Sequence, residues 1–152
     1  MRLALDTNTA VSGLLWDGVP SQLIRAALEG QVELVTSQAL LLELGDVLAR
    51  AKLAKRVAAS GFSVEELIAR YAVLARSVEP AAITPVSPDP DDDQVLACAL
   101  AAQVDLIVSG DAQLLNLKRY HGIGIVSATQ ALELVSQTPK PDETAPEADE
   151  SR

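Results

Sequence analysis

The sequence predicts an α/β fold, a three-layer α/β/α sandwich around a central parallel sheet. Short apolar runs typical of strands alternate along the chain with longer segments of helical pattern. This alternation is typical of βαβ units, in which the crossover helices cover both faces of a parallel sheet. With 152 residues, 49% of them hydrophobic, the chain is long enough for one globular domain with its own core.

The first half of the chain is expected to alternate between strands and helices. The strands are residues 2–7 and 32–37. The helices are residues 10–16, 20–30, 37–50 and 62–78. Ser37 is a candidate N-cap for the helix at 37–50, and Ser63 with Glu66 has the spacing of a capping box. A short basic segment, residues 50–56, separates the last two helices.

The second half continues the alternation after a loop. Residues 80–90, PAAITPVSPDP, are dense in proline and predict a connecting segment with at most a short strand. The elements expected next are a helix at 92–103, a strand at 105–110, a helical turn at 112–116, a strand at 123–127 and a helix at 128–135. We therefore expect one folded domain at residues 1–135. Residues 136–152 lack large apolar side chains and predict a disordered acidic tail.

The sequence also indicates where the protein is found and which kinds of chemistry are disfavoured. No apolar run reaches the roughly 18 residues of a membrane span, and the N-terminus has no signal-peptide pattern. We therefore expect a cytoplasmic protein. The single cysteine, Cys98, lies in the apolar run VLACALA and is expected to be a small core residue. Residues 122–124, GIG, lack the further spacing of a dinucleotide-binding loop, which disfavours an NAD enzyme.

The distribution of charge along the chain is compatible with a nucleic-acid partner, although the net charge is negative. A net charge of −9 argues by itself against binding a polyanion. Aromatic residues make up 3% of the chain, too few for a base-stacking platform. Basic side chains nevertheless gather in two segments, with Arg50, Lys52, Lys55 and Arg56 in the first and Lys118 and Arg119 in the second. They predict contacts with a phosphate backbone, and the alternative is a solvated helix surface.

Acidic residues stand where the predicted strands end. Asp6 directly follows the apolar residues LAL of the first strand, Asp111 follows a later strand, and Asp92 begins a helix. Ligands of parallel α/β sheets bind at the carboxyl ends of the strands, so these carboxylates are expected to converge with Glu43. A structural alternative exists for each aspartate, since each can cap a helix or stabilise a turn.

Glu43 separates the functional interpretation from the structural one. It introduces a charge into the apolar segment ALLLELGDVL, and no basic residue lies three or four positions away. A buried charge has to be paired, bound to a metal, or neutralised through a raised pKa. A bound cation also explains how the run DPDDD can gather like charges. Carboxylates without a His or Cys cluster favour Mg²⁺ or Mn²⁺, and the sole histidine, His121, lies away from the acidic motifs.

Three segments of the sequence resemble one protein family. They are LALDTN at the start, SQALLLELGDVLARAKLAKR in the first half and DPDDDQVLACALAAQVDLIVSGDAQLL in the second. They resemble the PIN domain (PilT N-terminus) family over residues 1–135, and within it the VapC-like ribonucleases, the toxins of toxin–antitoxin pairs. The resemblance implies a PIN-like three-layer sandwich and a Mg²⁺- or Mn²⁺-dependent nuclease acting on RNA. It also implies a homodimer and a cognate antitoxin as partner.

The resemblance also implies roles for individual residues. Catalysis and metal binding fall on Asp6, Glu43, Asp92 and Asp111. Supporting roles fall on Asn8, Ser109, Asp89 and Asp93. Many relatives have threonine at the position of Ser109. Relatives often have asparagine at the position of Asp93, so Asp92 and Asp93 are both candidates for the third acid.

Three functions are compatible with these features. The first is a divalent-metal-dependent endoribonuclease that acts as a toxin. The second is a catalytically idle domain of the same fold that binds RNA or a protein. The third is a phosphotransfer receiver module, which also gathers acids at strand ends but needs a lysine after a late strand. Ala128 and Thr129 follow that strand instead, which disfavours the third function.

Overall fold

Helices and strands alternate along the chain as the hydrophobic pattern predicts. The computed structural model describes residues 1–137. The strands are β1 (Arg2–Leu5), β2 (Glu33–Thr36), β3 (Arg76–Ser77), β4 (Leu106–Val108), β5 (Arg119–Tyr120) and β6 (Ile123–Val126). The helices are α1 (Thr7–Leu15), α2 (Val19–Leu28), α3 (Gln38–Leu48), the 3₁₀ helix η1 (Ala51–Leu53), α4 (Ala54–Ser60), α5 (Val64–Leu74), α6 (Pro90–Ala102), α7 (Ala112–Leu117) and α8 (Ala128–Ser136). The predicted tail, residues 136–152, lies outside the described residues from residue 138 onward.

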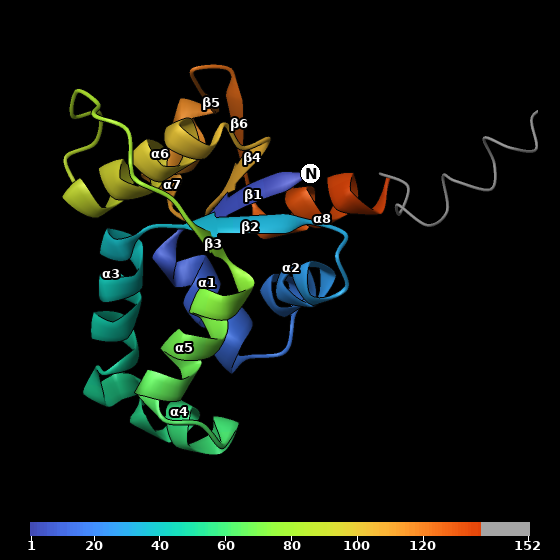
Figure 1. The fold of residues 1–152 in the computed structure, drawn as a ribbon, viewed down its shortest axis with the longest axis vertical. Helices are drawn as coiled ribbons and strands as arrows, with labels where there is room; N and C mark the ends of the chain where they lie inside the picture. Colours follow the sequence, from blue (N-terminus) through green and yellow to red (C-terminus); the bar gives the residue numbers. More distant parts are fainter. Residues whose placement is uncertain (138–152) are drawn as a thin grey trace, which may run out of the picture.

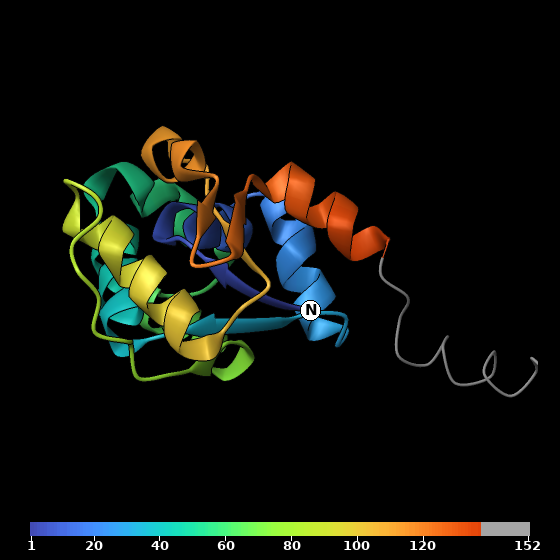
Figure 2. The same ribbon diagram turned by 90° about the horizontal axis from the view of Figure 1, so that it is seen from above.

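The six strands of the described chain form one sheet with the order β3-β2-β1-β4-β6-β5. Neighbouring strands are parallel, apart from β5, which pairs antiparallel with β6. Ala4 of β1 is paired with Val35 of β2 on one side and with Ile107 of β4 on the other. Figure 1 shows α6 and α7 on one face of the sheet and α1, α2 and α5 on the other, and Figure 2 looks onto the α6 side. The predicted three-layer α/β/α sandwich is confirmed.

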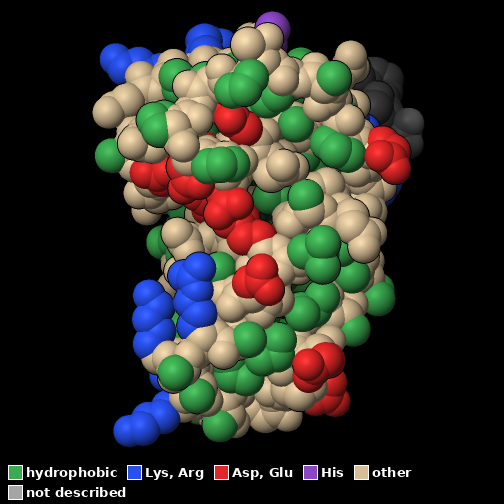
Figure 3. Space-filling model, turned by 90° about the vertical axis from the view of Figure 1, so that its left-hand side faces the viewer, with side chains coloured by type: hydrophobic (Ala, Val, Ile, Leu, Met, Phe, Trp, Pro, Cys, Tyr) green, Lys and Arg blue, Asp and Glu red, His purple; other side chains and the backbone are tan. Residues whose placement is uncertain are grey.

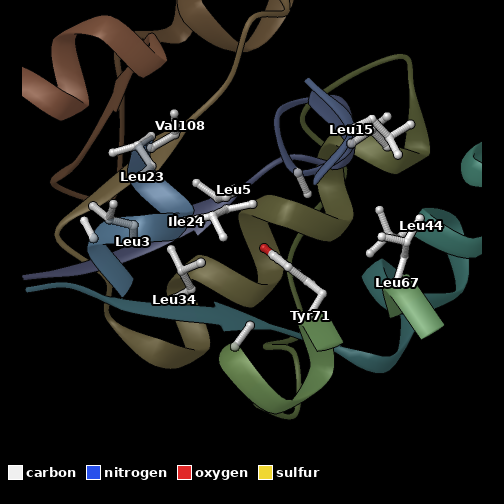
Figure 4. Packing of buried hydrophobic residues seen from close by; sticks show 14 of the residues in the cluster. Leu3, Leu5, Leu15, Leu23, Ile24, Leu34, Leu44, Leu67, Tyr71 and Val108 are labelled. Carbon is white, nitrogen blue, oxygen red and sulfur yellow. The ribbon is translucent and has the colours of Figure 1, made fainter. Parts of the chain in front are cut away.

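Alternating side chains of the strands build a core on each face of the sheet. Leu3 and Leu5 of β1 belong to a cluster with side chains of α1, α2 and α5. Ala4, between them, belongs to a second cluster with side chains of α6 and α7. Figure 4 shows the first cluster, with Leu23 and Ile24 of α2 beside the leucines of β1. Both faces are therefore buried, as a parallel sheet with helices on both sides requires.

The helix starts are formed by side-chain caps. Ser37 caps α3 through its Oγ, as predicted. Ser63 and Glu66 form the predicted capping box of α5, with Ser63 Oγ accepting from the Glu66 N–H at 3.1 Å and Glu66 Oε1 accepting from the Ser63 N–H at 2.8 Å. The first helix starts earlier than predicted, at Thr7, because the Asp6 side chain caps it.

Three segments of the chain differ from the prediction. Residues 76–77 leave the predicted helix 62–78 and form β3, because their backbone pairs with β2. The basic segment 50–56 enters η1 and α4, and α4 ends before Gly61, which has a φ of 82°. β5 forms a hairpin with β6 through a turn at His121, which also has a positive φ. These elements depend on strand pairing and turn geometry, which a hydrophobic pattern does not record.

Burial accounts for several apolar residues of the chain. Cys98 is fully buried in α6, and burial raises the pKa of its thiol to about 11, which confirms it as a core residue. On α5, Leu67, Tyr71 and Ala75 at its C-cap are buried in the core, whereas Val73 is exposed. Among the described residues, no helix has the length and apolar character needed to span a bilayer.

Candidate active site

Two of the predicted acids follow adjacent strands, β1 and β4. Asp6 comes directly after β1, and its backbone N–H donates to the carbonyl oxygen of Val108 at 3.0 Å. The Ser109 hydroxyl donates to Asp6 Oδ2 at 2.5 Å and accepts from the backbone N–H of Asp111 at 2.9 Å. Ser109 is almost fully buried. It therefore ties the Asp6 carboxylate to the segment that carries Asp111.

Asp6 and Asp111 also cap the helices that follow them. Asp6 Oδ1 accepts from the Thr9 N–H at 2.9 Å at the start of α1. Asp111 Oδ1 accepts from the Gln113 N–H at 3.1 Å at the start of α7. Both aspartates therefore cap helices, which is the structural alternative considered above, and both also lie at the carboxyl edge of the sheet. Capping also orients both carboxylates before any ligand binds.

Asp92 lies in the first turn of α6 and interacts with Asp111. The side chain is buried, and the Ser87 hydroxyl donates to Asp92 Oδ2 at 2.8 Å. Burial is the largest cause that raises the pKa of Asp92 from 3.8 to about 6. The Ser87 bond lowers this pKa, while the negative charges of Asp111 and Asp89 and a side-chain hydrogen bond with Asp111 raise it. Asp92 therefore stands where negative charge is crowded.

Glu43, in the middle of α3, meets the first turn of α6. Its carboxyl accepts a hydrogen bond from the Thr7 hydroxyl and shares another with Asp91. Burial is the largest cause that raises the pKa of Glu43 from 4.5 to about 7, the Thr7 bond lowers it, and Asp91 and Asp89 raise it. Within residues 1–137, no Lys or Arg forms an ion pair with Glu43. Glu43 therefore has no basic partner, either within its own helix or from another element of the described chain.

Of the two candidates for the third acid, Asp92 is the one that interacts with another predicted acid, Asp111. Asp93 turns instead toward the preceding loop, where its Oδ1 accepts from the backbone N–H groups of Val86 and Ser87, both at 3.0 Å. Those two bonds fix the end of the loop against α6. The interaction of Asp92 with Asp111 thus favours Asp92 as the site residue.

The remaining supporting positions have different surroundings. Ser109 contacts Asp6, as described above. Asp89 is the N-cap of α6, and its Oδ1 accepts from the Asp91 N–H at 3.0 Å. Asn8 is exposed on the first turn of α1. Asp89 thus has a capping role in addition to its charge near Asp92, and Asn8 is open to solvent.

Three side chains that contact the acids were not identified from the sequence. Asp91 belongs to the run DPDDD, and this run was the only sequence feature that pointed to it. Thr7 lies between Asp6 and Asn8, and its contact depends on how α3 crosses α1. Ser87 lies in the proline-dense loop, and its contact depends on the path of that loop. No sequence pattern distinguishes Ser87 from the other serines of the chain.

We group these residues as one candidate site, which we call the acidic site and define as Asp6, Glu43, Asp91, Asp92 and Asp111. Figure 3 shows Asp and Glu side chains in an oblique row across this face of the molecule. Within residues 1–137, no three His, Cys, Asp or Glu side chains form a group that could hold a metal ion as they stand. The contacts instead join Glu43 with Asp91 and Asp92 with Asp111.

The chemistry of the acidic site fits a hard divalent cation. Its donors are carboxylate oxygens, the ligands that Mg²⁺ and Mn²⁺ prefer. Burial, together with the charges of neighbouring aspartates, raises the pKa of Glu43 and that of Asp92, so each carboxyl is difficult to ionise without a counter-charge. A cation among them would offset that repulsion.

The predicted basic residues lie on both sides of the acidic site. Those of the first segment are exposed on and before η1 and α4, and those of the second at the end of α7 and in β5. Figure 1 shows α4 and β5 at opposite ends of the long axis, and Figure 3 shows Lys and Arg side chains above and below the acidic row. The Arg56 guanidinium lies 5.0 Å from the centre of the Trp16 ring, so it also interacts within the protein.

Comparison with known families gives one match. The model of the PIN domain family matches residues 2–113. The matched segment runs from β1 into α7 and includes every member of the acidic site. No curated protein and no solved structure matches the chain.

Proposed function

The chain belongs to the PIN domain family, and on that premise we propose that it is a divalent-metal-dependent endoribonuclease that hydrolyses RNA phosphodiester bonds. PIN domains are generally nucleases, and PIN domain nucleases typically use divalent metals. The observation that carries the proposal is the acidic site, where Glu43 contacts Asp91, Asp92 contacts Asp111, and Ser109 ties Asp6 to the segment of Asp111 at the ends of β1 and β4. A structural core gains nothing from such crowding of charge.

Mg²⁺ or Mn²⁺ is the cofactor that these donors fit. The residues that would hold it are Asp6, Glu43, Asp92 and Asp111, with Asp91 beside them. When bound, such a cation lowers the pKa of a water molecule and neutralises charge on the phosphate. The protein contributes carboxylates from separate elements and hydroxyl donors that orient them.

Binding of the cation should depend on pH. In the metal-free protein the pKa of Glu43 is about 7 and that of Asp92 is about 6, so both carboxyls have to lose a proton before they can act as ligands. A bound cation would lower the pKa of the carboxylates that it contacts.

We further propose that the protein is the toxin of a toxin–antitoxin pair, a cytoplasmic homodimer inhibited by a cognate antitoxin. This proposal is supported by the resemblance to the VapC-like ribonucleases. Leu67 and Tyr71 of α5 lie in the core and are not available to a dimer interface, whereas Val73 of the same helix is exposed. Light scattering tests whether the protein is a dimer. Expression in cells tests the toxin, which should arrest growth only when Asp111 is intact.

A second candidate is a catalytically idle PIN domain that binds RNA or a protein. One observation favours it, since in the part of the chain that the structure describes the acids stand in pairs and no group of three could hold a metal as it stands. An idle domain would bind RNA through its basic residues without cleaving it.

RNA cleavage measured against Mn²⁺ concentration distinguishes the two candidates. Wild-type protein should cleave with Mn²⁺ and stop with EDTA, and Asp111→Asn should slow cleavage by about 100-fold or more because a metal ligand is worth several kcal/mol to the transition state. Asp17→Asn is the matched control, because Asp17 is an exposed aspartate beyond the far end of α1. RNA binding without cleavage at any Mn²⁺ concentration identifies the idle domain, and full activity of Asp111→Asn rejects the proposed site.

A further inference from the structure

Thr7 is a buried polar residue that joins two members of the acidic site. It is the first residue of α1, directly after Asp6, and only 8% of its surface is exposed. Its hydroxyl donates to Oε1 of Glu43, which lies 36 positions further along the chain in α3. Because the Asp6 side chain caps α1, one short turn of backbone orients both the Asp6 carboxylate and the Thr7 hydroxyl.

The Glu43 carboxyl needs such an anchor. A glutamate side chain rotates about several bonds, and the negative charges of Asp91 and Asp89 repel the ionised form of Glu43. Among the described residues, Thr7 is the only neutral side chain that donates a hydrogen bond to this carboxyl. Threonine is β-branched and therefore stiff, so its hydroxyl provides a fixed point against which Glu43 can be held.

Two other acids of the site, Asp6 and Asp92, are held in the same way. Ser109 donates to Asp6 Oδ2 and Ser87 donates to Asp92 Oδ2. Each of these acids thus has one hydroxyl donor that comes from a different segment of the chain. Donors behind metal-binding side chains keep the ligands oriented, and their loss weakens metal binding even though they never touch the metal.

We infer that Thr7 is a positioning residue whose hydroxyl holds the Glu43 carboxylate beside Asp6, so that both carboxylates can bind the same divalent cation. The inference rests on the proposed function, because it assumes that the acidic site takes up a metal. It assigns Thr7 no contact with the metal or with RNA. Thr7 acts through Glu43 alone.

Calorimetric titration of the full-length protein with Mn²⁺ tests the inference without any RNA. Thr7→Val keeps the shape of the side chain and removes the donor, so it should weaken Mn²⁺ binding by about tenfold or more. Thr7→Ser restores the hydroxyl and should bind within about threefold of the wild type. Thr9→Val is the matched control, because Thr9 lies in the same turn, is 7% exposed, and has no side-chain hydrogen bond to an acid of the site among residues 1–137.

A double-mutant cycle separates positioning from a general loss of structure. If Thr7 acts through Glu43, Thr7→Val should weaken Mn²⁺ binding no further in a Glu43→Gln background. Circular dichroism checks that each variant is folded, and Thr7→Ala replaces Thr7→Val if the valine variant is not. If Thr7→Val binds Mn²⁺ as tightly as the wild type does, the inference is overturned and the proposed function stands. A wild-type protein that binds no Mn²⁺ overturns both.

Discussion

The Glu43 carboxyl lies where an ionised group is poorly stabilised. It is partly buried, two aspartates are close to it, and the one neutral donor that it has among the described residues is the Thr7 hydroxyl. The sequence located this conflict through the charge inside an apolar helix. It did not identify Asp91 and Thr7 as the partners, because both contacts depend on how α1, α3 and α6 pack together.

The metal-free protein should become less stable as pH rises through the pKa of Glu43. The folded-state pKa is raised from 4.5 to about 7, so the folded protein binds this proton more tightly than the unfolded chain does. The resulting stabilisation is complete below about pH 4.5 and is lost as pH rises toward about pH 7. Asp92, with a pKa raised to about 6, contributes in the same direction.

Thermal unfolding of wild type and Glu43→Gln in EDTA checks this expectation. The melting temperature of the wild type should fall relative to that of Glu43→Gln between about pH 5 and about pH 8. Added Mn²⁺ should reduce the difference, because a bound cation stabilises the ionised carboxylate. Two melting curves that stay parallel across this range would mean that Glu43 ionises as easily in the folded protein as in the unfolded chain.

The first turn of α6 gives three successive aspartates three different surroundings. Asp91 pairs with Glu43, Asp92 interacts with Asp111, and Asp93 accepts two backbone bonds from the loop. Successive residues of a helix point in directions about 100° apart. One short acidic run can therefore face a site, a second helix and a loop at the same time.

Substitutions in this turn should have opposite effects on stability and metal binding. Asp93→Ala should lower the free energy of unfolding by about 1–2 kcal/mol, because two backbone donors lose a charged acceptor. Asp92→Asn should keep or raise stability in EDTA, because it removes a crowded charge, and should abolish Mn²⁺-dependent cleavage. Chemical denaturation and cleavage assays of both variants check these outcomes. Loss of cleavage in a folded Asp93→Asn variant, with Asp92→Asn still active, would make Asp93 the third acid.

Most elements were predictable from the sequence, but the two-residue strands were not. Ser37, Ser63 and Glu66 marked the starts of α3 and α5 because capping is a local property of a few adjacent residues. β3 and β5 have two residues each, and they exist because a neighbouring strand offers its edge. Pairing between strands depends on residues from different parts of the chain, so it leaves no periodic pattern in the local sequence.

At the scale of the whole molecule, the acidic and basic side chains are separated on the face that Figure 3 shows. The acidic row crosses one face, and basic side chains lie toward the two ends of the long axis. The acids at the strand ends could be predicted to converge, because parallel strands bring their carboxyl ends to one edge. The separation of the two basic groups could not, since it depends on where α4 and β5 lie relative to the sheet.

RNA binding should depend strongly on salt. If the exposed Lys and Arg side chains contact phosphates, log affinity should fall with log salt concentration with a slope of about 0.7 per phosphate contacted. Fluorescence anisotropy with the Asp111→Asn variant measures binding without cleavage. Replacing Arg50, Lys52 and Lys55 by alanine should reduce the slope, and so should replacing Lys118 and Arg119. An affinity unchanged between about 50 and about 200 mM salt would exclude phosphate contacts as the main source of binding.

The central claim is that the acidic site holds a divalent cation, and a crystal structure with Mn²⁺ tests it most directly. An anomalous difference map recorded at a wavelength where manganese scatters anomalously locates the metal independently of any assumption about the site. We predict a manganese peak among the carboxylate oxygens of Asp6, Glu43, Asp92 and Asp111, and no such peak in crystals of Asp6→Asn. A map whose manganese peaks all lie away from these carboxylates, or which contains none, would contradict the account.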